Sequence, residues 1–294
     1  MNDTGQSSEQ PLKGRVALVT GASRGAGKGI ALALGKAGAT VYLSGRTRQE
    51  GGAALPGHLQ ATADAVDAAG GKGIAVICDH ADDRQVEALV AQIRAEQDRL
   101  DLLVNNVTCV PDGMTDAGPF WNKPLALLDI CDVGMRSHYV CTYYAADLLC
   151  RSQGAVVMTS SFGGRIYMHG PAYGAGKAAV DKMAHDMAID FKPFNVPVIS
   201  LWMGFLLTER SLAVIEAEPE KYGALVDTAE TPEYPGQVIA AFVNDAARME
   251  KTGQVWIGAE LGEAYGVVDS NGRQPPSHRA MFGSPTEFGD AVVE

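Results

Sequence analysis

The stretch RVALVTGASRGAG, residues 15–27, decides the fold of this chain. Its first part, residues 15–20, is mostly apolar, which is typical of a buried strand in a parallel sheet. Gly21, Gly25 and Gly27 come next, and we expect a helix at 27–37. The first two glycines permit a tight turn and the third lets the helix pack on the sheet, so the helix N-terminus can hold a pyrophosphate. Glycine triplets also occur in ordinary connections, but this position after the first strand favours nucleotide binding.

The rest of the chain alternates short apolar runs with longer amphipathic ones. Further strands are expected at 40–44, 73–78, 102–105, 155–160, 197–202 and 254–257, and helices at 59–69, 82–96, 124–150, 172–191 and 231–244. Such alternation predicts a parallel sheet covered on both faces, which is a three-layer, doubly wound α/β (Rossmann) fold.

A single domain is expected, because no repeat or linker divides the chain. We place this dinucleotide-binding and catalytic domain at 14–269, after a flexible N-terminal arm at 1–13. A Gly/Pro-rich tail follows at 270–294 and is expected to be loosely ordered unless it docks on a neighbour.

Composition excludes several classes of function. Of 294 residues, 24 are Lys or Arg and 35 are Asp or Glu, so the net charge of -11 argues against nucleic acid and anionic membranes as partners. The five cysteines are odd in number and form no CxxC pair, which favours a reducing cytoplasm. The polar N-terminus does not read as a signal peptide, and no apolar run is long enough to cross a bilayer. Histidine spacing predicts no metal site.

The run YGAGK, residues 173–177, places a phenol and an amine four residues apart. On a helix the two side chains lie on one face, one turn apart. A cation at that distance favours the phenolate and lowers the pKa of the phenol from its usual value of about 10. The pair can then act as a general acid and base near neutral pH, as carbonyl reduction or alcohol oxidation requires. Ser160 and Ser161 lie upstream and strengthen this interpretation.

Residues after the second predicted strand bear on the choice of cofactor. An acidic residue commonly stands there to hold the ribose 2′-hydroxyl of NAD, whereas an arginine accepts the 2′-phosphate of NADP. This chain has Ser44 and Arg46 at that point, and Arg24 lies in the glycine turn. The pattern favours NADP(H) over NAD(H). The alternative for Arg46 is a solvated loop charge.

Taken together, these segments resemble the short-chain dehydrogenase/reductase family from about residue 14 to residue 257. The segments that match the family's motifs are TGASRGAG (20–27), CDH (78–80), NNVT (105–108), SS (160–161) with YGAGK (173–177), and MGFLLT (203–208), in which Met203 replaces a proline. A closer likeness, in PFW (119–121), VGMRSHY (133–139), YGAGKAAVDK (173–182) and SLWMG (200–204), is to a subgroup that reduces steroids and assorted carbonyl compounds.

This resemblance implies catalytic roles for three residues. Tyr173 would protonate the carbonyl oxygen as hydride is transferred, or deprotonate the alcohol in the reverse direction. Lys177 would lower the pKa of Tyr173 and bind the nicotinamide ribose. Ser161 would hold the substrate oxygen; Ser160 stands at a common family interval, but the alignment of Gly164 favours Ser161.

The resemblance also implies the cofactor contacts. Asp79 would contact the adenine, Asn105 would brace the sheet beside the cofactor, and Thr208 with the backbone near Leu206 would meet the carboxamide. The remaining contacts would come from Gly21, Ser23, Arg24, Gly25, Gly27, Ser44, Arg46, Tyr173 and Lys177.

One position departs from the family pattern. Many members carry an asparagine in the fifth helix that anchors a water of a proton relay, and Gly134 stands there in this chain. Glycine supplies no side-chain amide and weakens a helix interior by about 1 kcal/mol. The relay would then run through backbone and water, or through Ser137 or His138.

An apolar substrate pocket is expected at the carboxyl ends of the strands. Its walls would come from 107–123 and from the segment 205–234, which would close over the substrate. The expected apolar lining is Met203, Phe205, Leu206, Leu207, Trp121 and Tyr167, which suits an aromatic, alicyclic or steroid-like carbonyl. His169 either lines this pocket or is a surface imidazole.

Two further expectations concern assembly and rival functions. The helices near 134–150 and 173–190 carry small residues, and the resemblance implies that these helices pair to form a homodimer or homotetramer. The residues concerned are Ala145, Ala146, Ala178, Ala179, Ala184 and Ala188.

The alternatives to an oxidoreductase are a cofactor-binding sensor or scaffold without turnover, and a lyase or epimerase on the same fold.

Overall fold

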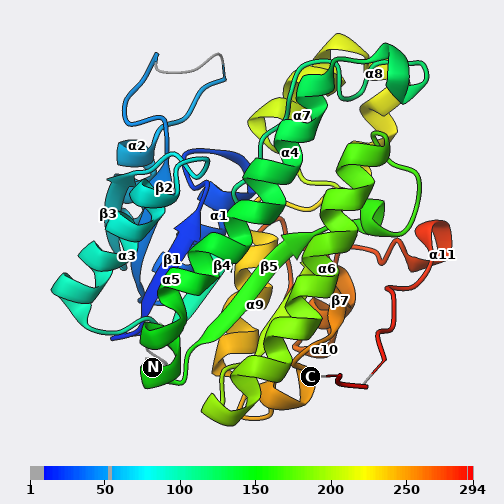
Figure 1. Cartoon of the computed structure of the whole chain (residues 1–294). Coiled ribbons are helices and arrows are strands. Elements are labelled where there is room, and N and C mark those ends of the chain that lie inside the picture. The colour runs from blue at the N-terminus through cyan, green and yellow to red at the C-terminus, as the bar shows by residue number, and fades with distance from the viewer. Residues whose placement is uncertain (1–9, 52–54, 290, 294) are drawn as a thin grey trace, which may run out of the picture.

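Seven parallel strands form the sheet at the centre of the molecule (Figure 1), in the order β3-β2-β1-β4-β5-β6-β7. The computed structural model describes residues 10–51, 55–289 and 291–293. The strands are β1 (Val16–Thr20), β2 (Thr40–Gly45), β3 (Lys72–Ile77), β4 (Leu102–Asn105), β5 (Ala155–Ser160), β6 (Val198–Trp202) and β7 (Val255–Ile257). All seven lie within one residue of their predicted positions at each end.

Strand order reverses beside β1, which pairs with β2 on one side and with β4 on the other. In open parallel sheets a crevice forms at such a point, outside the carboxyl ends of the strands. Here β1 ends at Thr20 and β4 ends at Asn105, and both residues are fully buried. The crevice is therefore expected beside the glycine turn that follows Thr20.

Helices cover both faces of the sheet, as the predicted three-layer fold requires. One core joins β1 to α1 (Gly25–Lys36), α2 (Leu59–Ala68), α9 (Tyr234–Asn244) and α10 (Gly258–Ala264). The other joins it to α3 (Asp83–Gln97), α5 (Ser137–Ser152) and α6 (Pro171–Phe191), which lie in front of the sheet in Figure 1. The strand residues of β1 divide between the two cores, since successive side chains point to opposite faces. The predicted fold class is confirmed.

The helix predicted at 124–150 is broken in the structure. It consists of the 3₁₀ turn η2 (Leu125–Leu128), α4 (Asp129–Cys131), the π-helical turn η3 (Asp132–Arg136) and α5. Gly134 lies at the bend with φ of +146°, and an added Cβ would lie 2.8 Å from Thr108 Oγ1. The expectation that Gly134 weakens a helix interior is therefore wrong, because this backbone conformation favours glycine.

Shorter elements surround the carboxyl ends of β5 and β6. After β6 come α7 (Glu209–Ala217), α8 (Pro219–Tyr222) and η6 (Gly223–Asp227). The other short helices are η1 (Phe120–Asn122), η4 (Phe162–Gly164), η5 (Lys192–Phe194), η7 (Arg248–Lys251) and α11 (Arg279–Phe282). Across the described residues, no helix combines the length and hydropathy needed to cross a membrane.

Described residues near both ends of the chain contact the domain. Residues 1–9 of the predicted arm lie outside the described residues, whereas Leu12 is buried and its N–H donates to the Ala37 carbonyl at 2.8 Å. In the C-terminal segment, the Phe282 ring lies 5.2 Å from that of Phe162, and Arg279 forms an ion pair with Glu260. The described part of this segment thus docks on its own domain, close to the end of β5.

Candidate active site

Tyr173 and Ser161 meet at the carboxyl end of β5. Tyr173 lies in the first turn of α6, and Ser161 directly follows β5. Ser161 Oγ lies 2.8 Å from the Tyr173 hydroxyl and accepts a hydrogen bond from the Gly163 N–H at 3.2 Å. A Cβ on Gly163 would lie 2.3 Å from the Tyr173 ring, so only glycine allows this approach. Ser160 points elsewhere and donates to the Lys177 carbonyl at 3.4 Å.

Lys177 lies one turn after Tyr173 and is buried. Its Nζ donates to the Thr159 carbonyl at 3.2 Å and lies 6.0 Å from the centre of the Tyr173 ring. Burial lowers the pKa of Lys177 to about 8, against the opposing effect of Asp181. The two side chains predicted to share one helix face therefore do lie on the same side of α6.

The expected effect of Lys177 on Tyr173 needs a correction. Burial raises the pKa of Tyr173, and the hydroxyl of Ser161 is the group that opposes this rise. In the protein by itself, desolvation of the phenolate therefore outweighs any effect of the lysine.

The glycine turn has the geometry of an anion cradle. Gly21 and Gly25 have φ of +70° and +59°, and a Cβ on Gly21 would lie 2.7 Å from Val107 Cα. The N–H of Gly25, at the first residue of α1, donates to Glu209 Oε2 at 2.8 Å. A carboxylate therefore already binds at this helix N-terminus, where the helix dipole favours negative charge. Backbone and site fit the pyrophosphate of a dinucleotide.

A Cβ at the third glycine of the turn, Gly27, would meet two neighbours. It would lie 2.3 Å from the Gly21 carbonyl oxygen and 2.6 Å from Asn106 Nδ2. The Gly21 carbonyl and the Asn106 side chain therefore leave no room for a side chain at position 27. Ser23, between the glycines, is buried.

The two predicted phosphate-binding arginines lie on the β2 side of the turn. Arg24 donates to the carbonyls of Pro56 and Gly57 at 3.0 and 2.8 Å, and to Thr47 Oγ1 at 3.3 Å. Arg46 is exposed and lies 4.0 Å from the Asp79 carboxylate. A surface pair at this distance contributes little to stability. Arg46 is thus the more available of the two guanidinium groups.

Ser44 does not lie with these arginines. Its side chain is fully buried, and its Oγ lies 2.8 Å from His80 Nε2. Burial lowers the pKa of His80 to about 4. The Ser44 hydroxyl therefore contacts His80 in this structure. Its position at the end of a predicted strand did not indicate this contact.

Asn105 ends β4 beside the crevice and is fully buried. Its Nδ2 donates to Thr142 Oγ1 at 2.9 Å, which ties β4 to α5. Its Oδ1 is buried and has no hydrogen-bond partner among the described residues. A buried polar atom without a partner is costly, which marks Asn105 as a residue that fits a further group.

The loop after β6 lies against the glycine turn. Thr208 caps α7 in a reciprocal pair with Ser211, and its methyl carbon lies 3.6 Å from where a Cβ on Gly25 would be. Leu206 pairs with Glu230 through an isolated backbone bridge. The contact with Gly25 brings Thr208, 183 positions further along the chain, to the glycine turn, and Leu206 lies two residues before it.

A cavity of about 510 Å³ lies between the 114–131 segment and the start of α6. Its lining is mostly apolar and includes Tyr173 and His169. Of the apolar residues predicted to line a pocket, it includes Trp121, whereas the others lie outside it. Met114 and Phe120 belong to the predicted wall segment 107–123, whereas the apolar residues that the sequence analysis missed are Leu125, Leu127, Leu128, Ile130 and Cys131. The apolar run at 125–131 was the signal for them.

His169 lines this cavity together with Tyr173. Its ring packs edge-on against Tyr173 with 5.1 Å between centroids, and its backbone has φ of +58°. Non-glycine residues adopt this conformation rarely, and such strain is common at functional sites. Burial lowers the pKa of His169 from its ordinary value, and so does the nearby Lys123.

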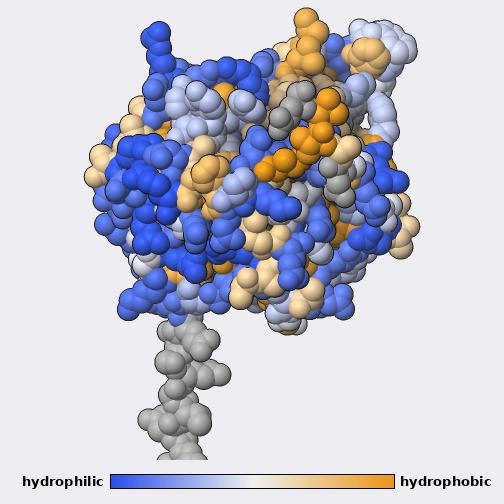
Figure 2. Space-filling view, turned by 60° about the horizontal axis from the view of Figure 1, so that its bottom comes forward, coloured by the Kyte–Doolittle hydropathy of each residue, from blue (hydrophilic) through white to orange (hydrophobic). Residues whose placement is uncertain are grey.

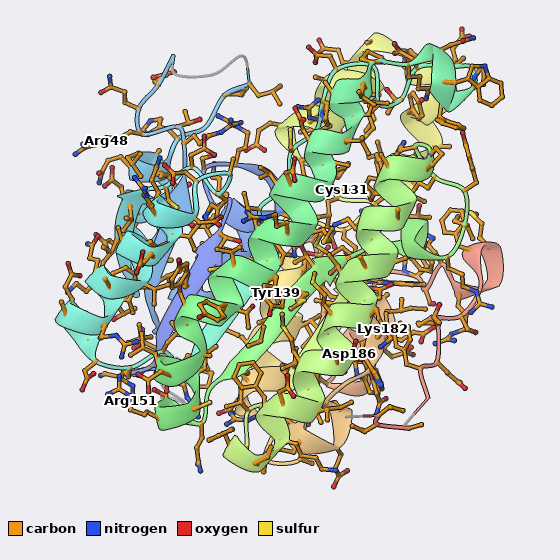
Figure 3. All side chains as sticks on the ribbon, in the orientation of Figure 1. Arg48, Cys131, Tyr139, Arg151, Lys182 and Asp186 are labelled. Atoms are coloured by element: carbon orange, nitrogen blue, oxygen red, sulfur yellow. The ribbon has the colours of Figure 1, made fainter. Side chains whose placement is uncertain are left out.

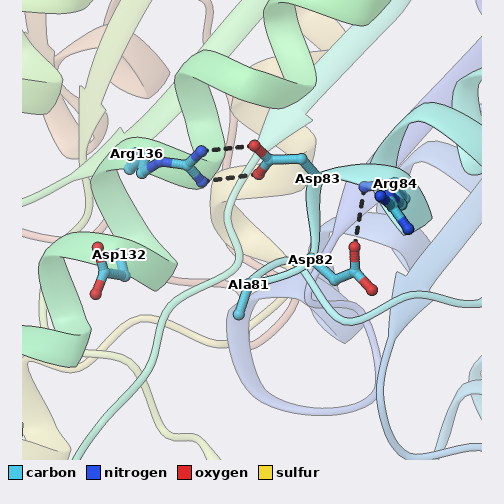
Figure 4. Close-up of a pocket in the computed structure, with 6 residues that line it drawn as sticks. All are labelled: Ala81, Asp82, Asp83, Arg84, Asp132 and Arg136. Atoms are coloured by element: carbon cyan, nitrogen blue, oxygen red, sulfur yellow. Dashed lines mark hydrogen bonds and ion pairs between the residues drawn. The ribbon is translucent and has the colours of Figure 1, made fainter.

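A second hollow of about 550 Å³ is lined by charged residues (Figure 4). The Arg136 guanidinium binds both carboxylate oxygens of Asp83 at 2.6 and 2.7 Å, and Asp82 caps α3. These groups satisfy one another at the surface. The hollow is lined by none of the predicted catalytic residues.

The outer faces of α5 and α6 carry exposed aromatic and charged side chains. Tyr139 and Tyr143 are 54% and 68% exposed, and Lys182 forms an ion pair with Asp186 on α6 (Figure 3). Ala145, Ala184 and Ala188 instead lie in the core. In Figure 2 hydrophobic side chains gather in the upper right of a mostly hydrophilic surface. Of the other alanines named for these helices, Ala178 is exposed, and Ala146 and Ala179 are half-buried.

Known proteins resemble this chain over most of its length. The family model for short chain dehydrogenases matches residues 15–219. Dehydrogenase/reductase SDR family member 1 of Mus musculus is 38% identical over 275 residues, covering 90% of this chain and 85% of the mouse protein. A 3beta-hydroxysteroid dehydrogenase of Mediterraneibacter gnavus is 30% identical over 71% of this chain and 74% of its own length.

A solved structure supports the same relationship. A short-chain type dehydrogenase/reductase from Mycobacterium marinum is 27% identical, with a TM-score of 0.69, and the match covers 85% of this chain and 96% of that one. The family resemblance that the motifs indicate is confirmed, and the mouse relative confirms the closer likeness as well.

Proposed function

Because this chain belongs to the short-chain dehydrogenase/reductase family, whose members are NAD(P)-dependent oxidoreductases, we propose that it interconverts a carbonyl and a secondary alcohol with NADP(H). The observation that carries the proposal is the 2.8 Å contact between Ser161 Oγ and the Tyr173 hydroxyl. A general acid must lie within hydrogen-bond reach of the substrate oxygen that it protonates, and two hydroxyls at this distance can reach the same oxygen.

Tyr173 acts as the general acid in reduction and as the general base in oxidation. Its hydroxyl gives its proton to the carbonyl oxygen, and Ser161 donates a hydrogen bond to the negative charge that develops there. Burial holds Tyr173 protonated in the free protein, which suits the reductive direction. Lys177, on the same side of α6, supplies the positive charge that stabilises the phenolate after proton transfer.

The glycine turn, Arg24, Arg46, Asn105 and Thr208 would hold the dinucleotide. When bound, NADPH supplies the hydride for reduction, and NADP⁺ accepts it in oxidation. Arg46 supports the choice of NADP(H), since it is exposed at the end of β2 and free to meet a 2′-phosphate. The Gly25 N–H supports pyrophosphate binding, because it already donates to a carboxylate.

The substrate is a largely apolar carbonyl compound or alcohol, such as an alicyclic one. The apolar cavity beside Tyr173 supports this class, as does the similarity to a 3beta-hydroxysteroid dehydrogenase.

Exposed Tyr139 and Tyr143 support pairing of α5 and α6 in a homodimer or homotetramer. Light scattering tests that assembly, and a monomer would contradict it.

The experiment is NADPH oxidation followed by absorbance over a panel of apolar ketones and aldehydes. Tyr173→Phe is expected to lower kcat by about 10²–10⁴-fold, the usual contribution of a general acid. The matched control is Tyr143→Phe, which removes an exposed hydroxyl and is expected to retain activity. Equal rates for the wild type and Tyr173→Phe would contradict the proposal and favour a cofactor-binding scaffold.

A further inference from the structure

A buried carboxylate, Asp181, lies behind the Tyr173–Lys177 pair. It stands one turn after Lys177 on α6 and is 2% exposed. Ser200 Oγ donates to its Oδ1 at 2.6 Å, and Trp202 Nε1 donates to both carboxylate oxygens at 3.0 and 3.1 Å. Two strand residues of β6 thus hold the carboxylate in a fixed orientation, as a buried acid requires.

Asp181 also touches the catalytic loop. A Cβ on Gly164 would lie 2.8 Å from Asp181 Oδ2, so the loop that carries Ser161 packs directly on this carboxylate. Ser160, on the strand before the loop, bonds to the Lys177 carbonyl. A single side chain therefore connects α6, β6 and η4 at the point where the three catalytic residues converge.

The hydrogen-bond donors to Asp181 are all neutral, so they leave its charge uncompensated. Among the buried residues of the described chain, Lys177 is the one lysine or arginine. A buried ammonium and a buried carboxylate each lose hydration, and although Lys177 and Asp181 form no ion pair within 4.0 Å, each charge favours the charged form of the other. Residues four apart on a helix lie on one face, which places the two charges on neighbouring turns.

Resting on the proposed function, we propose that Asp181 is a positioning residue for the reaction, which acts on Tyr173 by keeping Lys177 protonated. The Lys177 ammonium, in turn, is the charge that stabilises the phenolate. Removal of the Asp181 charge would therefore act on Tyr173 through Lys177. No part of the proposal requires Asp181 to contact substrate or cofactor.

The titratable groups that face Lys177 are few. They are Asp181 and Tyr173 on α6 and His138 on α5. The neighbouring residues of β5 and β6 carry no titratable side chain, and they are Thr159, Ser160, Ser200 and Trp202. Burial raises the pKa of Asp181 to about 6 and lowers that of Lys177 to about 8, so both are charged between those values. Burial lowers the pKa of His138 to about 3, so it stays neutral over this range.

The test is Asp181→Asn, which keeps the shape and an acceptor for Trp202 but removes the charge. The pKa of Lys177 is expected to fall further by about one unit, since a nearby opposite charge is lost. In alcohol oxidation, the rise of kcat with pH should move about one unit higher, because a less charged lysine stabilises the phenolate less. Asp186→Asn, which removes the same charge from the outer face of α6 (Figure 3), should leave the profile unchanged.

A melting series over pH tests the charge coupling without turnover. A lysine with a lowered pKa costs the folded state stability as pH falls from about 10.5 to its folded pKa. The wild type should therefore stop losing melting temperature near pH 8, whereas Asp181→Asn should go on losing it to about pH 7. Trp202→Phe removes a hydrogen-bond donor to the Asp181 carboxylate. It should shift the kcat profile and the melting curve in the same direction as Asp181→Asn, but by less.

The outcomes separate this inference from the proposed function. Melting curves of wild type and Asp181→Asn that stay parallel over pH would overturn the inference, as would coincident kcat profiles from two folded proteins. A wild type that is inactive across the carbonyl panel, with the melting coupling intact, would overturn the proposed function alone.

Discussion

The catalytic side and the cofactor side of the crevice differ in what their polar groups contact. On the catalytic side, Ser161 and Tyr173 already face each other at 2.8 Å, and Lys177 is buried one turn away. On the cofactor side, the Gly25 N–H binds Glu209, and Arg24 binds the carbonyls of Pro56 and Gly57. The catalytic groups are thus assembled in advance, whereas several proposed cofactor-binding groups are occupied by other parts of the protein.

This difference has an energetic consequence. Preorganised catalytic groups need no rearrangement when charge develops in the transition state. Occupied binding groups must first give up a protein partner, so the affinity for the cofactor is the difference between two sets of contacts. Substitutions on the catalytic side should therefore lower the rate, whereas those on the cofactor side can either weaken or strengthen binding.

After Tyr173→Phe, the largest effect is expected from Ser161→Ala. Loss of a donor to the developing oxyanion should lower kcat by about 10²–10³-fold, with little change in the Kd for NADPH. Stopped-flow measurement of hydride transfer and fluorescence titration of NADPH check the two parts separately.

Ser160→Ala is the matched control for this prediction. Ser160 is buried and binds the Lys177 carbonyl rather than Tyr173, so its loss should lower kcat far less. A greater loss with Ser160→Ala than with Ser161→Ala would exchange the roles of the two serines and break the comparison.

Part of this site was predictable from the sequence because it depends on local spacing. Tyr173 and Lys177 are four residues apart on a helix, and Gly21 and Gly25 flank a strand-to-helix turn, so the chain itself sets these geometries. Spacing did not predict the direction in which burial shifts the pKa of Tyr173, because desolvation depends on residues from several elements.

Contacts between distant residues were beyond the sequence. Glu209 lies 184 positions from Gly25, and Ser44 lies 36 from His80, so no pattern along the chain shows that either pair meets. The bend at Gly134 was missed for a related reason, since helical spacing continues on both sides of it. The sequence therefore could not predict which protein groups contact the proposed cofactor-binding residues.

A second, smaller effect is expected from Arg46→Ala. Loss of a charge-assisted hydrogen bond to a 2′-phosphate, at about 1.5–3 kcal/mol, should raise the Kd for NADPH about 30-fold and leave that for NADH nearly unchanged. Calorimetric titration with both cofactors measures this. The control is Arg48→Ala, an exposed arginine in the same loop (Figure 3).

The two cofactors can also refute this assignment directly. If NADH protects the wild type against thermal unfolding better than NADPH does, the assignment to NADP(H) is wrong. If Arg46→Ala weakens both cofactors equally, Arg46 acts on the shared part of the molecule rather than on the 2′-phosphate.

The smallest effect, and the one with the opposite sign, is expected from Glu209→Gln. The carboxylate of Glu209 binds the α1 N-terminus, which is the position proposed for the pyrophosphate, so cofactor must displace it. An amide is a weaker competitor at a helix N-terminus and does not repel a phosphate. The Kd for NADPH should fall about fivefold, since a negative charge at a partly exposed helix N-terminus contributes about 1 kcal/mol.

Glu216→Gln provides the control for charge alone, because Glu216 is exposed on the same helix. It removes one negative charge from α7 and should change the Kd for NADPH little. Equal tightening by both variants would assign the effect to long-range charge, and it should then vanish at high salt. Weaker binding by Glu209→Gln would instead mean that Glu209 holds α7 in place for the cofactor, and that the cofactor side is as preorganised as the catalytic one.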